Sequence, residues 1–172
     1  MSDAIRFNSL RQYVELVAGA PRRYGPEQAL LAYGRDWKPS EASPAWLVMG
    51  PKRNCFANAL AYAVDRSDVY YVEGYALDRQ LGIPMAHAWL VNDRGSVIDP
   101  TWDDPGENDY FGIAFNRAFV VKFAGVTDGE PFLHPAVMRS NYGSSEEIRA
   151  GMEDSFGPLD SQCRVDVAIA ST

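Results

Sequence analysis

The sequence has little cysteine and little histidine, with two residues of each in 172. Zinc sites need about four such ligands at short, regular spacings. The four residues Cys55, Cys163, His87 and His134 match no such spacing. The two cysteines lie far apart in the chain, and in a reducing compartment we expect them as free thiols rather than as a disulfide. A metal site is therefore not expected.

Positive charge and long apolar runs are also scarce. The 16 Lys and Arg against 23 Asp and Glu give a net charge of −7, which argues against binding to nucleic acid or to an anionic membrane. No apolar run approaches the ~20 residues of a membrane span, and the N-terminus lacks the basic start and apolar stretch of a signal peptide. No glycine-rich phosphate loop is present, which makes a nucleotide-like ligand a weak third option. We expect a cytoplasmic protein without a cofactor, a nucleic-acid partner or a membrane partner.

What the sequence does contain is typical of a globular chain. Apolar residues make up 47% and charged residues 23%, near the average for folded proteins, and the length suits one domain with a real core. We expect a single domain over residues 1–172. Its core would lie at 50–125, with N-terminal helices within 5–35 and a C-terminal extension at 126–172.

The order of local patterns predicts the fold class. In the segment 54–67 apolar residues recur at helical spacing, and Asn54 is a favoured N-cap, so a helix with one buried face should begin at Cys55. Consecutive strands after one central helix predict an α+β fold, with an antiparallel sheet packed against the helix that carries Cys55. The predicted strands are 69–77, 85–91, 96–102 and 118–124, and further helices are predicted at 5–18, 26–33 and 144–153.

His87 and Asp99 lie on two strands of one predicted hairpin. The turn "NDRG" (92–95) favours a type I turn with Gly95 in the left-handed conformation, which makes a three-residue loop with a bulge. This register puts Trp89 opposite Asp99. Residues two apart on a strand share a face, so His87 and Asp99 become diagonal neighbours. A two-residue loop would move Asp99 to the other face.

Cys55 would supply the nucleophile for these two residues. A thiolate is favoured at a helix N-terminus and beside an imidazolium, and the N–H groups of a helix start can bind a developing oxyanion. His87 would be the base, and Asp99 would hold its tautomer. Each residue alone has an ordinary structural explanation; their combined order indicates a catalytic triad. Cys163 and His134 are interpreted as structural or surface residues.

The quoted motifs resemble a known family. A Cys at a helix start, then "HAWL" (87–90) and "VIDPTW" (97–102), is similar to the transglutaminase-like branch of the papain-like cysteine peptidase superfamily. The resemblance covers residues 50–102 and implies that Cys55 is the nucleophile, His87 the base and Asp99 the orienting residue. The stretch "PTWDDPGENDYFGIAF" also resembles small uncharacterised bacterial and phage proteins, which carry no known substrate.

The chain departs from the family near the cysteine. The flank "RNCFANA" lacks the Gly or Trp that many members have there. The side-chain donor that helps to bind the oxyanion in such sites is not evident; Asn54 and Gln28 are the candidates.

Aromatic and acidic residues are expected around the site. Trp89, Trp102 and Tyr110 are the candidates for the substrate cleft, against the alternative of core packing. The segment 103–112, read as a loop with four acidic residues, could form one wall and favour a basic or neutral substrate. The loop 77–85 could form the opposite wall.

These observations predict a thiol-dependent hydrolase or acyltransferase that acts on an amide or peptide carbonyl. Hydrolysis is the default, because an amine acceptor needs a second pocket. The substrate would be a protein, a peptide or a small amide, and the oligomeric state stays open. The alternative is a non-catalytic binding or inhibitory protein, phage-encoded and directed at a host protein, that keeps the fold. The exposure and reactivity of Cys55 distinguish the two.

Overall fold

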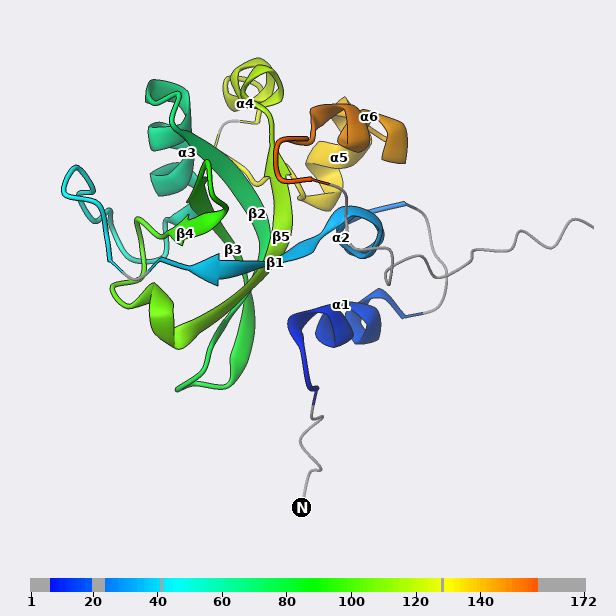
Figure 1. Ribbon diagram of the computed structural model, residues 1–172. Coiled ribbons are helices and arrows are strands. Elements are labelled where there is room, and N and C mark those ends of the chain that lie inside the picture. Colours follow the sequence, from blue (N-terminus) through cyan, green and yellow to red (C-terminus); the bar gives the residue numbers. More distant parts are fainter. Residues whose placement is uncertain (1–6, 20–23, 41, 128, 158–172) are drawn as a thin grey trace, which may run out of the picture.

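The computed structural model describes residues 7–19, 24–40, 42–127 and 129–157. Helices and strands alternate irregularly along this part of the chain, which confirms the α+β class (Figure 1). The helices are α1 (Leu10–Ala18), α2 (Pro26–Tyr33), α3 (Cys55–Asp65), α4 (Arg117–Ala124), α5 (Pro135–Asn141) and α6 (Ser145–Gly151), with a 3-10 turn η1 (Pro105–Glu107). The strands are β1 (Arg35–Pro39), β2 (Val69–Asp78), β3 (Ile83–Asn92), β4 (Ser96–Ile98) and β5 (Asn108–Phe115).

The strands close into a small barrel in the order β1-β4-β3-β2-β5. All neighbouring pairs are antiparallel except β1 and β4, which run parallel. Tight curling requires glycine where β2 crosses β5, because Gly74 pairs with Gly112 there. A Cβ on Gly112 would lie 2.5 Å from the Glu73 carbonyl oxygen and 2.7 Å from the Trp89 ring. Glycine at this position therefore allows the close approach of backbones that closes the barrel.

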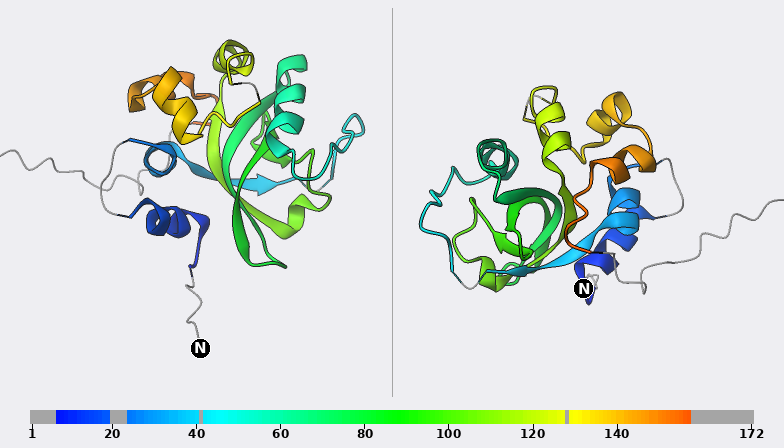
Figure 2. Two further views of the ribbon diagram at one scale, coloured as in Figure 1. Left: turned by 180° about the vertical axis from the view of Figure 1, so that it is seen from behind. Right: turned by 45° about the horizontal axis from the view of Figure 1, so that its top comes forward.

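The two faces of the curled sheet have different neighbours. The inner face forms a compact apolar cluster of Trp37, Val72, Ala76, Trp89, Val91, Val97, Tyr110 and Ala114. His87 points to the same inner side, because it lies opposite Gly74 in the β2–β3 ladder. The helices gather in an arc around the outside of the strands, as Figures 1 and 2 show from three directions. The outer face thus carries the larger core.

Helix α3 packs on the outer face against β3 and β2. Its buried alanines, Ala59 and Ala63, lie in the same cluster as Ala88 and Leu90 of β3, and larger, partly buried side chains of the helix pack beside them. This packing turns the first residue of the helix, Cys55, toward the end of the barrel that carries His87, and both residues line one cavity.

The C-terminal part also packs on the barrel. The Glu73 carboxylate of β2 accepts hydrogen bonds from the backbone N–H groups of Phe132 and Leu133, at 2.7 Å each. The Asn116 amide donates to the Ala150 and Met152 carbonyls. The described residues beyond 126 are therefore tied to the sheet at several points.

Three element predictions are wrong. Residues 118–124 form helix α4 instead of a strand, since Asn116 caps it by accepting from Phe119 N–H and the buried residues recur at helical spacing. Most of 103–112 is not a loop, because β5 starts at Asn108 and lies between β1 and β2. The strand expected over 96–102 ends at Ile98.

Other predictions are confirmed within the described residues. Helices α2 and α3 have the expected extents, α1 covers Leu10–Ala18 within the predicted 5–18, and α6 begins with the capping box of Ser144 and Glu147. Cys163 lies outside the described residues. In the part of the chain that the structure describes, no helix has the length and apolar character needed to cross a membrane.

Candidate active site

The β3–β4 hairpin has the register predicted from its turn. Gly95 adopts a φ of 74°, and the Asn92 side chain accepts from the backbone N–H groups of Arg94 and Ser96. The ladder pairs Leu90 with Ile98 and Val91 with Val97. Asp99 follows β4 directly. The asparagine and the left-handed glycine together place Asp99 on the same face as His87.

His87 and Asp99 form a buried pair. His87 Nε2 lies 2.7 Å from Asp99 Oδ2, and the two residues are 2% and 1% exposed. Burial lowers the pKa of His87, but the hydrogen bond to Asp99 and the neighbouring Cys55 thiol outweigh it and raise this pKa to about 9. Because Asp99 occupies Nε2, Nδ1 is the ring nitrogen left for the thiol. The raised pKa favours the protonated form of His87 at neutral pH.

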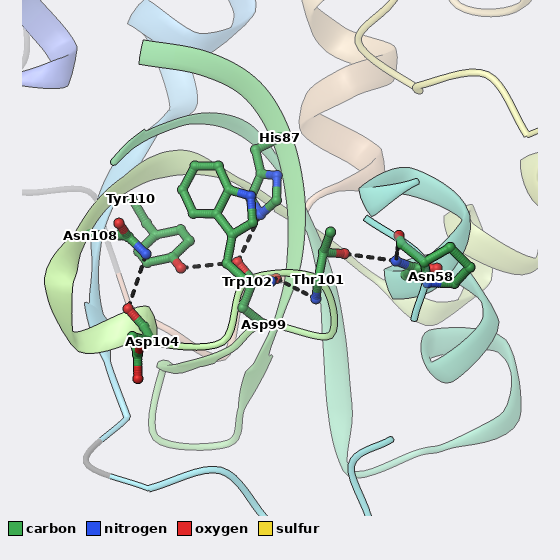
Figure 3. A network of polar contacts seen from close by, with 9 residues as sticks. Asn58, His87, Asp99, Thr101, Trp102, Asp104, Asn108 and Tyr110 are labelled. Atoms are coloured by element: carbon green, nitrogen blue, oxygen red, sulfur yellow. Dashed lines mark hydrogen bonds and ion pairs between the residues drawn. The ribbon is translucent and has the colours of Figure 1, made fainter. Parts of the chain in front are cut away.

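The Asp99 carboxylate is held by four donors (Figure 3). Oδ1 accepts from the backbone N–H groups of Thr101 at 2.8 Å and Trp102 at 3.1 Å. Oδ2 accepts from the Tyr110 hydroxyl at 2.9 Å as well as facing His87. Burial and the nearby Asp99 raise the pKa of Tyr110, so its hydroxyl stays a donor. A carboxylate fixed in this way can hold an imidazole in one tautomer and one orientation.

Cys55 is the first residue of α3 and is 8% exposed. The N–H groups of a first helical turn have no partner within the helix, so they remain available to an incoming oxygen. Arg53, two residues earlier, has a φ of 69°, which is uncommon for a residue other than glycine. Backbone strain of this kind often occurs at functional sites. The backbone immediately before Cys55 is therefore strained at Arg53.

A cavity of about 700 Å³ joins Cys55 and His87, and we call it the site cavity. The two segments expected as walls both line it, one from β2 and the β2–β3 turn and the other after Asp99. Four acidic and two basic residues stand around it: Asp78, Asp103, Asp104 and Glu107, with Lys52 and Arg53. Lys52 pairs with Asp103 at 3.6 Å. The balance of charge at the cavity is therefore negative.

The expected cleft residues separate into two groups. Trp102 lines the site cavity and stacks on His87, with ring centroids 4.2 Å apart. Trp89 and Tyr110 do not line it; both are buried on the inner face, where Tyr110 bonds Asp99. Both rings pack beside His87 and lie outside the lining of the site cavity.

The two expected oxyanion donors are placed differently. Asn54 is the N-cap residue of α3, exposed and next to Cys55, and its side chain makes no capping hydrogen bond. Gln28 lies on α2 and lines a separate cavity with Val17 and Pro135. The structure therefore does not bring Gln28 to Cys55, while Asn54 remains adjacent.

Asn58 and its partner Thr101 were not anticipated as residues of the site. Asn58, one turn after Cys55, donates from Nδ2 to Thr101 Oγ1 at 2.9 Å and to the Pro51 carbonyl at 3.0 Å. The available signal was an asparagine next to the buried Ala59 on α3. Among the described residues, no group of three or more His, Cys, Asp or Glu side chains is arranged to hold a metal ion.

Comparison with known proteins gave no match. No protein-family model, no curated protein and no solved structure matches this chain.

Proposed function

We propose that this protein is a thiol-dependent hydrolase or acyltransferase, in which Cys55, His87 and Asp99 attack an amide or peptide carbonyl. The observation that carries the proposal is the buried His87–Asp99 pair, whose imidazole lines the same cavity as a cysteine at a helix start. Nucleophile, base and orienting group are the parts that covalent acyl transfer requires.

The chemistry follows from the protonated imidazole. In the resting pair the proton of the Cys55 thiol already resides on His87 Nδ1, and the thiolate attacks the carbonyl carbon as the C=O electron pair moves to oxygen. When that pair returns, the C–N bond breaks and the amine leaves with the proton of His87. Water or an amine then attacks the thioester, giving its proton to His87 while the thiolate leaves. The Asp99 carboxylate holds the His87 ring in one orientation during both the formation and the breakdown of the thioester.

The developing oxyanion would be bound at the start of α3. The free N–H groups of the first turn and the helix dipole both favour negative charge there. The Asn54 amide is the adjacent side-chain donor. Water is the default acceptor, which makes hydrolysis the preferred reaction.

The charge of the site cavity indicates the substrate class. Asp104 and Glu107 stand on one wall and Asp78 on the other, with Leu81 and Met85 as apolar contacts. Negative walls attract a basic or neutral group and repel an anionic one. We therefore propose a peptide, protein or small amide with a basic or neutral group beside the scissile carbonyl.

The resemblance to transglutaminase-like and papain-like enzymes agrees with this arrangement. A helix that begins with the cysteine packs on antiparallel strands that carry the histidine and lead into the aspartate. Membership of that superfamily is proposed on this arrangement and on the "HAW" and "DPTW" motifs.

The test is the pH dependence of Cys55 alkylation by iodoacetamide, followed by mass spectrometry with Cys163 as internal comparison. We expect Cys55 to react rapidly at about pH 6, where an ordinary thiol of pKa ~8.5 is slow. His87→Ala should remove this reactivity, whereas His134→Ala, at an exposed N-cap, should not.

The contrary result would be a Cys55 that reacts no faster than an ordinary thiol and is indifferent to His87→Ala. The low exposure of Cys55 would then favour the second candidate, a binding or inhibitory protein without turnover.

A further inference from the structure

The Asn58 side chain bridges three segments of the candidate site. Its Nδ2 donates to the Thr101 hydroxyl and to the Pro51 carbonyl. Pro51 belongs to the chain that enters α3, and Thr101 belongs to the turn after Asp99. One amide group thus joins the helix of the nucleophile to the turn of the carboxylate.

The bridge continues directly to the His–Asp pair. The Thr101 backbone N–H donates to Asp99 Oδ1, and Asp99 Oδ2 faces His87 Nε2. Figure 3 shows the resulting chain of contacts from Asn58 through Thr101 and Asp99 to His87. Every link is 2.9 Å or shorter. The polar path therefore runs unbroken from the cysteine helix to the catalytic base.

Asn58 makes this link from within α3, whereas the Gly50–Pro100 hydrogen bond and the exposed Lys52–Asp103 pair reach the same turn from the loop before the helix. The packing of α3 on β3 is otherwise apolar, with Ala59 and Ala63 buried at its centre, and apolar contacts are non-directional. A buried hydrogen bond between two side chains fixes a distance and a direction. Asn58 is 9% exposed and Thr101 is 3% exposed, so water competes little for either group.

The surroundings leave little room for another position of the amide. The neighbouring residue Gly50 has no side chain, and a Cβ at that position would overlap the Asn58 amide group. The Gly50 N–H donates to the Pro100 carbonyl at 2.8 Å, so this loop is itself tied to the turn after Asp99. Glycine at position 50 is what admits the Asn58 side chain.

We propose that Asn58 and Thr101 are positioning residues, whose side-chain hydrogen bond sets the placement of Cys55 relative to the His87–Asp99 pair. This inference rests on the proposed function. Neither residue reacts; the bond keeps the thiol within hydrogen-bonding reach of His87 Nδ1. A displacement of ~1 Å at such a site can lower the rate by about 100-fold.

The matched variants are Thr101→Val, which keeps the shape and removes the hydroxyl, and Thr101→Ser, which keeps the hydroxyl. The measurement is the pH–rate profile of Cys55 alkylation in the full chain, with urea unfolding as a check of folding. Thr101→Val should slow alkylation at about pH 6 by tenfold to 100-fold and move the profile toward that of an ordinary thiol. Thr101→Ser should retain the wild-type profile.

Gly50→Ala provides a second route if Thr101→Val does not fold, because its methyl group displaces the Asn58 amide while Thr101 stays intact. It should slow alkylation in the same way. A Thr101→Val or Gly50→Ala protein that folds and keeps the wild-type profile, with His87→Ala still abolishing it, would overturn the positioning role alone. A wild-type Cys55 without His87-dependent reactivity would overturn both proposals.

Discussion

Two buried carboxylates in this protein are held by nearly the same set of donors, on opposite faces of one sheet. Each accepts from two consecutive backbone N–H groups and from one tyrosine hydroxyl. For Asp99 the donors are Thr101, Trp102 and Tyr110, and for Glu73 they are Phe132, Leu133 and Tyr71. The donor set alone therefore does not distinguish a structural carboxylate from one in an active site.

The difference is one further partner. Asp99 also faces His87, and His87 lines the site cavity. Glu73 has no imidazole beside it, and burial raises its pKa to about 7 against the three hydrogen bonds, which lower it. Its contacts hold the segment 131–133 on the outer face. We infer that Asp99 serves chemistry and Glu73 serves folding. The first three of the following four predictions test this division, and the fourth tests the charge of the site cavity.

The largest effect is expected from Asp99→Asn. An amide cannot hold a protonated imidazole as a carboxylate does, and alkylation of Cys55 at about pH 6 should fall by 100-fold or more. The assay is iodoacetamide labelling followed by mass spectrometry. Glu73→Gln is the matched control and should label at the wild-type rate. Equal slowing by both variants would contradict the division.

The free energy of unfolding, unlike the alkylation rate, should depend on Glu73. Glu73→Gln replaces an oxygen that accepts from buried N–H groups, and the free energy of unfolding should fall by about 1–3 kcal/mol. Urea denaturation measures this loss. Glu130→Gln changes an exposed side chain in the same segment and should leave the unfolding curve unchanged. A Glu73→Gln protein as stable as Glu130→Gln would remove the folding role of Glu73.

The pH dependence of stability should separate the two clusters. A raised pKa in the folded state means that protonation stabilises the fold, so the contribution is present at low pH and lost as pH rises. For Glu73 the loss should occur between 4.5 and about 7, and for His87 between 6.5 and about 9. Urea unfolding across this range should show both slopes. Glu73→Gln should remove only the slope between pH 4.5 and about 7. His87→Ala should remove only the slope between pH 6.5 and about 9. Any other pattern would contradict these assignments.

The smallest effect concerns the charge of the site cavity. A trimethylammonium methanethiosulfonate should modify Cys55 faster than the sulfonate analogue, with a ratio that falls as salt rises. Glu107→Gln should reduce this ratio by about threefold. Glu146→Gln removes the same charge on α6, outside the cavity lining, and should reduce it less. Equal reductions would mean that net charge alone steers the reagent.

The candidate site was more predictable than the fold. Residues close in sequence, in the turn between β3 and β4, determine how near His87 and Asp99 lie to each other. The turn residues Asn92 and Gly95 fix the register of the β3–β4 hairpin, and the register brings His87 and Asp99 together without any knowledge of distant segments. The start of α3 at Cys55 is likewise local, given Asn54 and the apolar spacing after it.

The wrong element predictions concern segments whose secondary structure depends on packing against distant parts of the chain. Residues 118–124 are rich in valine and phenylalanine, which favour strands, but Phe119, Val120 and Phe123 are buried together only as a helix on the barrel. The "NDYFG" segment reads as a loop because of Gly112, whereas that glycine is needed for close approach to Glu73 and Trp89. Neither contact can be read from neighbours in sequence.

Long-range placement also explains the residues misassigned around the site. Gln28 was a plausible donor by type, yet α2 packs against α1, β5 and α6, so Gln28 faces another cavity. Asn58 was overlooked because its partner, Thr101, is distant in sequence. Both depend on how α2 and α3 lie on the closed sheet.

The most direct measurement is acylation of Cys55 by 4-nitrophenyl acetate. The proposed function predicts a burst of nitrophenol stoichiometric with the protein, one acetyl group on Cys55 by mass spectrometry, and slow turnover at neutral pH. The burst should vanish in Cys55→Ala and His87→Ala and persist in Cys163→Ala. Nitrophenol release without a burst, or a burst unchanged by Cys55→Ala, would contradict the central claim that this thiol attacks carbonyl groups.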